Sequence, residues 1–238
     1  MRIAVLIPRY GDTRGPFTIS LARMLVKTLG TDLKGPSGPL KIEIEIFSSA
    51  SSDLPSNRET LWKAAIEWRA SHALWLDADH VFPSAALLLL LQHRLPVVGC
   101  NYARRSDPTG PVAARINAAG EVEPVWTTAE LARRAAVEEV AYVGLGLCLI
   151  DMAILPQLKA HVDKGPGWAN WQPFEKKRVP GHARAMGEDV SFLDELRAAG
   201  VRIYVDHGLS WHVGHVSDRI LTNADAEAQR EAWLARRG

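Results

Sequence analysis

Two aspartates stand directly after a short apolar run in the first half of the chain. Ala73 to Leu76 read as a buried strand, and Asp77 and Asp79 follow it in the segment Leu-Trp-Leu-Asp-Ala-Asp-His. Because side chains alternate along a strand, both carboxylates are predicted to point to one side and Ala78 to the other. An unpaired carboxylate at the mouth of a buried strand is costly or shifts its pKa. We therefore expect a divalent cation as the partner, and hard oxygen ligands of this kind suit Mg²⁺ or Mn²⁺.

Three later segments could contribute to the same chemistry. Glu188 and Asp189 open a predicted helix, and His212-Val213-Gly214 follows a predicted strand. Gly144 and Gly146 interrupt an apolar run, where strand glycines often mark a bulge or a place at which a ligand approaches the backbone. Each segment also has a simpler explanation, since acids at a helix start are favoured by the helix dipole and single histidines are often structural.

The first part of the chain alternates strands and helices. Apolar or alternating runs predict its strands, at 3–7, 41–47 and 73–76. Leucine spacing predicts the first helix, and a Ser56 and Glu59 capping-box pattern predicts the second. This order implies right-handed crossovers and a largely parallel sheet, in which ligands collect at the carboxyl ends of the strands. The loops that should share this rim are 8–11, 48–53 and 77–80.

The rest of the chain is mixed. Apolar runs predict strands at 96–102, 140–150 and 201–205, a hairpin from 112–116 and 122–126, and a short helix capped by Thr127 and Glu130. Residues 161–187 lack periodicity and carry Trp168 and Trp171, so they form either a functional lid or a loop that the tryptophans anchor on the core. We expect an α/β fold: one domain over 1–216, with a Rossmann-like, mostly parallel central sheet, flanking helices and a mixed second half. Residues 217–238 read as a helical tail.

Composition narrows the class of protein. The chain has 238 residues, of which 47% are hydrophobic, and its formal charge of +1 provides no overall field to attract nucleic acid or an anionic membrane. Cys100 and Cys148 lie in apolar runs, which predicts buried thiols and a reducing, cytoplasmic location. The first residues read as a strand and not a signal peptide, and the longest aliphatic run, 85–91, is too short to cross a membrane.

The order of these motifs resembles the GT-A fold glycosyltransferases of the Asp-x-Asp, family-2-like type, over roughly Arg2 to His215. Asp77-Ala78-Asp79 is similar to the family's Asp-x-Asp motif, and Gly187-Glu188-Asp189 to its downstream Glu-Asp. Residues 143–146 are similar to the glycine strand on the acceptor side, and 212–214 to the late metal-binding histidine. The resemblance implies a nucleotide-sugar donor, most often a UDP-sugar, and a hydroxyl-bearing acceptor, with Mn²⁺ or Mg²⁺ as cofactor.

The resemblance also implies roles for individual residues. Asp79 and His212 would hold the metal, Asp77 would orient the ribose, the sugar or a metal-bound water, and Asp189 would be the catalytic base, assisted by Glu188. His215, three residues after His212, is the less expected ligand. The residues carried over to the donor side are Pro8, Arg9, Tyr10, Arg58, Asp77 and Ala78. Those carried over to the acceptor side are Gly144, Gly146, Trp168 and Trp171.

Other functions stay open. Asp77 and Asp79 could form only a helix cap or a solvated turn. The segment Gly11-Asp-Thr-Arg-Gly15 hints at a sugar-phosphate nucleotidyltransferase, although the double-glycine opening of that class is missing. A non-catalytic module that binds a glycan or nucleotide is a further alternative. Within the enzyme interpretation, Arg104, Arg105 and the basic segment 176–178 could instead contact a nucleic acid with a hydroxylated base.

Overall fold

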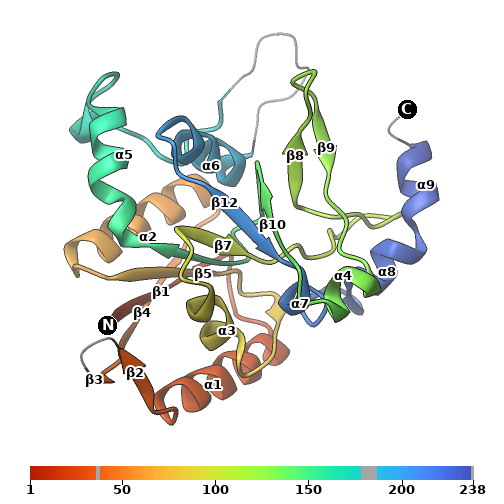
Figure 1. Ribbon diagram of the computed structural model, residues 1–238, viewed down its shortest axis with the longest axis horizontal. Coiled ribbons are helices and arrows are strands. Elements are labelled where there is room, and N and C mark those ends of the chain that lie inside the picture. Colours follow the sequence, from red (N-terminus) through yellow and green to blue (C-terminus); the bar gives the residue numbers. More distant parts are fainter. Residues whose placement is uncertain (36–37, 178–186, 237–238) are drawn as a thin grey trace.

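The computed structural model describes residues 1–35, 38–177 and 187–236. Its centre is a seven-stranded sheet with the order β10-β12-β7-β11-β5-β1-β4 (Figure 1). These strands are β1 (Arg2–Arg9), β4 (Glu43–Ala50), β5 (His72–Leu76), β7 (Val97–Gly99), β10 (Val137–Val140), β11 (Leu147–Asp151) and β12 (Ile203–Asp206).

The sheet is mixed rather than mostly parallel, because three of its neighbouring pairs are parallel and three are antiparallel. β1 pairs in parallel with β4 and β5, and β12 pairs in parallel with β7. β11 is antiparallel to both of its neighbours, and β10 is antiparallel to β12. Strands β4, β1, β5, β7 and β12 therefore run in one direction, and the two reversed strands lie in the second half of the chain. The molecule is an α/β fold with a mixed second half, as the sequence indicates.

Helices cover both faces of the sheet. One face carries α1 (Gly15–Leu29) and α3 (Ala86–His93), and the other carries α2 (Leu54–Glu67), α5 (Leu155–Val162) and α6 (Glu188–Ala198) (Figure 1). β1 shows why the sheet needs two layers. Ala4 and Leu6 join the core beneath α2 and α6, whereas Val5 and Ile7 join the core beneath α1 and α3. Both faces of this strand are apolar because both are buried.

Shorter elements surround the central sheet. They are β2 (Leu33–Gly35), β3 (Gly38–Leu40), β6 (His80–Val81), β8 (Ala114–Ile116), β9 (Val122–Pro124), α4 (Ala129–Arg133), η1 (Met152–Ile154), η2 (Trp168–Asn170), α7 (His207–Ser210), β13 (Gly214–Val216), β14 (Ile220–Leu221), α8 (Asn223–Ala228) and α9 (Arg230–Ala235). β8 and β9 form the predicted hairpin. β13 lies between β14 and β6 in a small second sheet. This small sheet matters for the site because it brings the segment after α7 next to the residues after β5.

Several local predictions need correction. Helix α2 begins at Leu54 rather than at a Ser56 cap, and the Ser56 hydroxyl instead donates to the Asp53 carboxylate. The cap of α4 is Thr128, whose hydroxyl accepts from Leu131 N, and not Thr127. The apolar run 140–150 is not one strand, because β10 ends at Val140 and β11 begins at Leu147. In the described part of the chain no helix is long and apolar enough to cross a membrane.

The C-terminal segment is more closely packed than a surface tail. Asn223 is buried and donates to the carbonyls of Asn101 and Ser210. Trp233, on α9, is buried against Gly110 and stacks edge-on with Trp126. The helical part of the tail prediction agrees with α8 and α9, and these helices hold the loop that contains Gly110.

Candidate functional site

A cleft of about 380 Å³ opens at the carboxyl ends of β1, β4 and β5. The predicted rim loops meet here, as expected for a parallel half-sheet. The cleft is lined by Pro8, Arg9, Tyr10, Asp12, Arg14, Ser51, Ser52, Leu54, Asp77, Ala78, Asp79, Arg105 and His215. Of the predicted donor-side residues, only the buried Arg58 is not in this lining.

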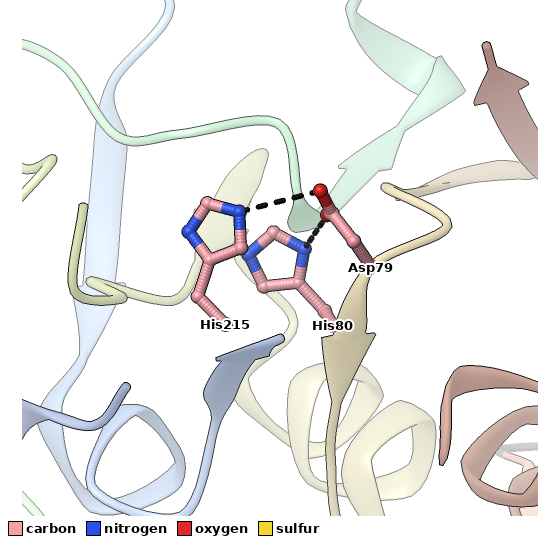
Figure 2. Close-up of side chains that lie close together, drawn as sticks. All are labelled: Asp79, His80 and His215. Atoms are coloured by element: carbon pink, nitrogen blue, oxygen red, sulfur yellow. Dashed lines mark ion pairs between the residues drawn. The ribbon is translucent and has the colours of Figure 1, made fainter. Parts of the chain in front are cut away.

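Asp79 lies at the centre of a small group of possible metal ligands. Its Oδ1 is 3.2 Å from His80 Nδ1, and its Oδ2 is 3.4 Å from His215 Nε2 (Figure 2). The two imidazole rings stack with centroids 4.5 Å apart and planes inclined by 18°. Burial alone would raise the pKa of Asp79, but hydrogen bonds from His215 and His80 outweigh it and hold this pKa well below its ordinary value. Asp79 is therefore a carboxylate at any physiological pH.

His215, and not His212, is the histidine that the fold brings to Asp79. β13 pairs with β6 in a register that sets His215 opposite His80. The Nδ1 of His215 is 3.0 Å from the carbonyl oxygen of Ala103, which leaves Nε2 directed at Asp79. His212 is exposed in the turn after α7 and does not belong to the cluster. In this structure His212 therefore lies apart from Asp79, and its predicted role as a metal ligand is supported by no contact with that carboxylate.

Asp77 has a different partner from Asp79. Its Oδ1 accepts from Arg58 Nη2 at 3.0 Å, and Arg58 Nε lies 3.5 Å from Glu188 Oε1. The two aspartates do not alternate along a strand, because β5 ends at Leu76 and the next residues form a turn. Asp77 N donates to Gly146 O at 3.0 Å, which holds this turn against the loop before β11. Ala78 also lines the cleft, and it packs, partly buried, against the core beneath α1 and α3.

Arg58 connects the cleft to the start of α6. It is 2% exposed and lies over the Trp75 ring, with its guanidinium carbon 5.4 Å from the ring centroid. Burial alone would lower the pKa of Arg58, but Asp77, Asp189 and Glu188 outweigh it and raise this pKa. The predicted donor-side arginine is thus a buried cation that three carboxylates surround, and its charge links Asp77 to the acids of α6.

Burial and neighbouring charges shift the pKa of Asp189. Burial raises the pKa of Asp189 above its ordinary value; Arg58 opposes this shift, whereas Glu188 and Asp77 add to it. Tyr102 lies near the same acids, and burial together with Asp77 and Asp189 raises the pKa of its hydroxyl well above normal. A carboxyl with a raised pKa is better matched to proton transfer near neutral pH than an ordinary aspartate.

Gly144 and Gly146 lie in the loop between β10 and β11, packed against aromatic rings. A Cβ on Gly144 would stand 2.2 Å from the Tyr102 hydroxyl oxygen, and one on Gly146 would stand 2.6 Å from His80 Cε1. The side chains of Tyr102 and His80 therefore approach the backbone closely at these glycines, and the predicted approach of a ligand stays a prediction. Gly146 N also donates to the Tyr102 hydroxyl at 3.2 Å.

Gly146→Ala should disturb the packing of His80 and Tyr102. Since His80 is fully buried and Tyr102 nearly so, neither ring has free space, and we expect a loss of about 1 to 3 kcal/mol in the free energy of unfolding. Urea denaturation measures the loss. Gly15→Ala is the matched control, because a Cβ there meets nothing within 4 Å. Equal stability of the two variants would contradict the tight packing of His80.

The remaining predicted residues divide into two groups. Pro8, Arg9 and Tyr10 line the cleft, with Tyr10 82% exposed and Arg9 Nε donating to Ser48 Oγ at 2.8 Å. Trp168 and Trp171 instead pack on the hydrophobic core beside Phe192. The tryptophans thus anchor this part of the chain on the core, as in the alternative interpretation. Residues 178–186 of the predicted lid lie outside the described residues.

Solved structures with a similar fold exist for this chain. No protein-family model matches the chain, and no curated protein matches it. Among solved structures, A197 from STIV is 21% identical with a TM-score of 0.54, over 94% of this chain and 92% of that one. GalNAc-T7, solved with UDP, GalNAc and Mn²⁺, is 11% identical with a TM-score of 0.50, over 91% of this chain. The chain has a GT-A-like fold. At these identities the similarity concerns the fold alone, and the match spans 44% of the GalNAc-T7 chain.

The sequence gives little or no weight to three residues that contact Asp79 in the structure. His80 was part of the quoted motif without a role, His215 was the less expected histidine, and Arg105 was considered only as a contact for nucleic acid. A signal existed for His80, which directly follows Asp79. None existed for the pairing of β6 with β13, because strands of two and three residues show no measurable periodicity.

Proposed function

We propose that the chain is a metal-dependent glycosyltransferase that transfers a sugar from a nucleotide-sugar donor to a hydroxyl group. The observation that carries this proposal is the cleft at the carboxyl ends of the strands, which combines Asp79 and His215 with Asp77 and the residues after β1. The GT-A-like fold supports it. GalNAc-T7 was solved with UDP and Mn²⁺, which makes a UDP-sugar the first donor class to test.

The residues around Asp79 fit a divalent cation. Among the described residues, the buried Nε2 of His80 has no hydrogen-bond partner, and ligand atoms of Asp79, His80 and His215 lie within 4.8 Å of one another. The contact between His215 Nδ1 and a backbone carbonyl matches the usual support of a metal-binding imidazole. A donor set of carboxylate and imidazole favours Mn²⁺ over Mg²⁺, which prefers oxygen alone. Bound to Asp79 and His215, the ion would act as a Lewis acid that stabilises charge on the leaving diphosphate.

The other residues of the site have roles that follow from their surroundings. Pro8, Arg9 and Tyr10 would bind the nucleoside, and Asp77, fixed by Arg58, would orient the ribose or the sugar. Asp189 would accept the proton of the acceptor hydroxyl, and Glu188 would keep Arg58 in place beside it. Residues 1–216 would form the catalytic domain, with 217–238 packed on it. Both cysteines are buried free thiols, and burial raises the pKa of Cys148 to about 12. Buried, unreactive thiols of this kind fit a cytoplasmic location.

Thermal stability against a panel of donors tests the proposal. UDP-, GDP-, CMP- and dTDP-sugars are each added to the purified protein with Mn²⁺ and, separately, with EDTA. We expect one nucleotide class to raise the melting temperature only when the metal is present. Release of the matching nucleoside diphosphate or monophosphate in the presence of an acceptor would follow. A shift that is unaffected by EDTA, or no shift with any donor, would contradict the proposal.

Asp189→Asn should lower the rate of transfer about 10²- to 10⁴-fold, because the base that takes the acceptor proton is lost. Donor affinity in the presence of Mn²⁺ should change little, because Asp189 is not among the residues that line the cleft around Asp77 and Asp79. In the wild type the rate should fall as the pH falls through the raised pKa of Asp189, since only the carboxylate accepts a proton. Steady-state kinetics from pH 5 to 8 measure both effects. A variant with full activity and an unchanged pH profile would assign the base elsewhere.

A further inference from the structure

Arg105 occupies the carboxylate oxygen that the proposed cation would use. Its Nη2 lies 2.9 Å from Asp79 Oδ2, the oxygen that also faces His215 Nε2. A cation bound to Asp79 and His215 would stand about 2 Å from each ligand atom. The guanidinium and the cation therefore compete for one oxygen, because repulsion between two positive charges at this distance weakens the binding of each.

The Arg105 side chain is free to leave this oxygen. It is 48% exposed, and among the described residues its ion pairs are made with Asp79 alone. It lines the same cleft as Arg9 and Arg14, so a small rotation keeps it within the cleft. A guanidinium displaced from Asp79 needs a new anion beside it.

The backbone that carries Arg105 is held in place. Arg104 N donates to Gly110 O at 2.9 Å, and the Thr109 hydroxyl donates to Arg104 O at 2.6 Å, which closes the loop. The tail secures this loop from outside, because Thr109 N donates to the Gln229 side chain at 2.9 Å and Trp233 packs on Gly110. Exchange at Asp79 therefore requires the side chain of Arg105 to move and not its loop.

We propose that Arg105 is a phosphate-binding residue of the cleft, which holds Asp79 until a divalent cation binds and then donates to the diphosphate of the nucleotide. This inference rests on the proposed function. A guanidinium forms its strongest contacts with carboxylates and phosphates, so the same group serves both partners. The exchange keeps every charge paired: Asp79 passes from Arg105 to the cation, and Arg105 passes to the phosphate.

Arg105→Gln tests the exchange through two dissociation constants measured by calorimetry. Without nucleotide, Mn²⁺ should bind about threefold to tenfold more tightly to the variant, because its competitor is gone. With saturating Mn²⁺, UDP should bind about tenfold more weakly, because a charge-assisted hydrogen bond is lost. Arg105→Lys keeps the charge, and both of its dissociation constants should lie between those of the wild type and those of Arg105→Gln. Arg134→Gln, which removes an exposed arginine paired with Glu130, is the matched control and should change neither constant.

The outcomes separate this inference from the proposed function. A wild-type protein that binds neither Mn²⁺ nor UDP overturns the function and the inference together. A wild type with Mn²⁺-dependent UDP binding, combined with unchanged constants in Arg105→Gln, overturns only the role of Arg105. Weaker binding of both Mn²⁺ and UDP by a folded Arg105→Gln would also overturn it, because competition requires the two constants to move in opposite directions.

Discussion

Asp79→Asn should abolish the metal-dependent binding of a nucleotide donor. The substitution removes the negative charge that faces His215 and Arg105, while the shape of the side chain stays nearly the same. Loss of a residue that only supports a metal ligand typically costs 10- to 100-fold in affinity, so loss of a ligand itself should cost at least about 100-fold for Mn²⁺. Calorimetry with Mn²⁺, and then with UDP in the presence of Mn²⁺, measures both losses.

The two nearby histidines provide the control for this prediction. His215→Ala should weaken Mn²⁺ binding in the same direction as Asp79→Asn, because its Nε2 faces the same carboxylate oxygen. His212→Ala should leave Mn²⁺ affinity unchanged, because His212 is exposed outside the cluster. The opposite order of effects would restore the ligand assignment that the sequence motif favours and would contradict the geometry around Asp79.

His212 and His215 differ in a way that local sequence does not determine. The motif order predicts that a histidine after the last strand lies near Asp79, and in the structure the histidine beside Asp79 is His215. Which histidine lies there depends on how α7 and the following turn place β13 in the small sheet, where His215 pairs with His80. Pairing between such short strands is non-local and leaves no pattern in the chain. Local sequence therefore located the segment, and tertiary contacts selected the residue.

The apolar run 140–150 is a second place where tertiary contacts, and not local sequence, determine the structure. Hydrophobicity predicted one strand, and burial is indeed continuous through the run. The backbone leaves the sheet because Gly144 and Gly146 bring it against Tyr102 and His80, where a side chain would collide. A sequence reports that residues are buried, but it does not report which neighbours bury them. β1 and α6 were predictable from local sequence, because a short continuous apolar run indicates a strand buried on both faces and an apolar face at helical spacing indicates a helix.

Arg58→Met should have the largest effect on stability. The substitution keeps an apolar stem over Trp75, but it leaves Asp77 and Glu188 without their buried cation and Asp189 without its nearest positive charge. Breaking a buried ion pair by removing one partner costs about 3 to 5 kcal/mol in the free energy of unfolding. Urea denaturation at pH 7 measures this loss.

Arg115→Met is the matched control for Arg58→Met. Arg115 also lies between two carboxylates, 3.3 Å from Glu123 and 3.6 Å from Glu138, but its side chain is 55% exposed. Exposed pairs of this kind contribute about 0 to 1 kcal/mol, so equal losses in the two variants would show that burial of Arg58 is not what makes its charge important.

Arg58→Met also separates the stabilising role of Arg58 from its effect on the pKa of Asp189. Arg58 lowers the pKa of Asp189 against the effect of burial, so its removal should raise that pKa further. Any transfer activity that Arg58→Met retains should then lose rate at a higher pH than the wild type, because the carboxylate form of Asp189 persists only above its pKa. If the pH at which the rate falls on the acidic side were the same in both proteins, Asp189 would not be the group that titrates. If that pH is higher in Arg58→Met, Arg58 is the residue that sets the pH range of the reaction.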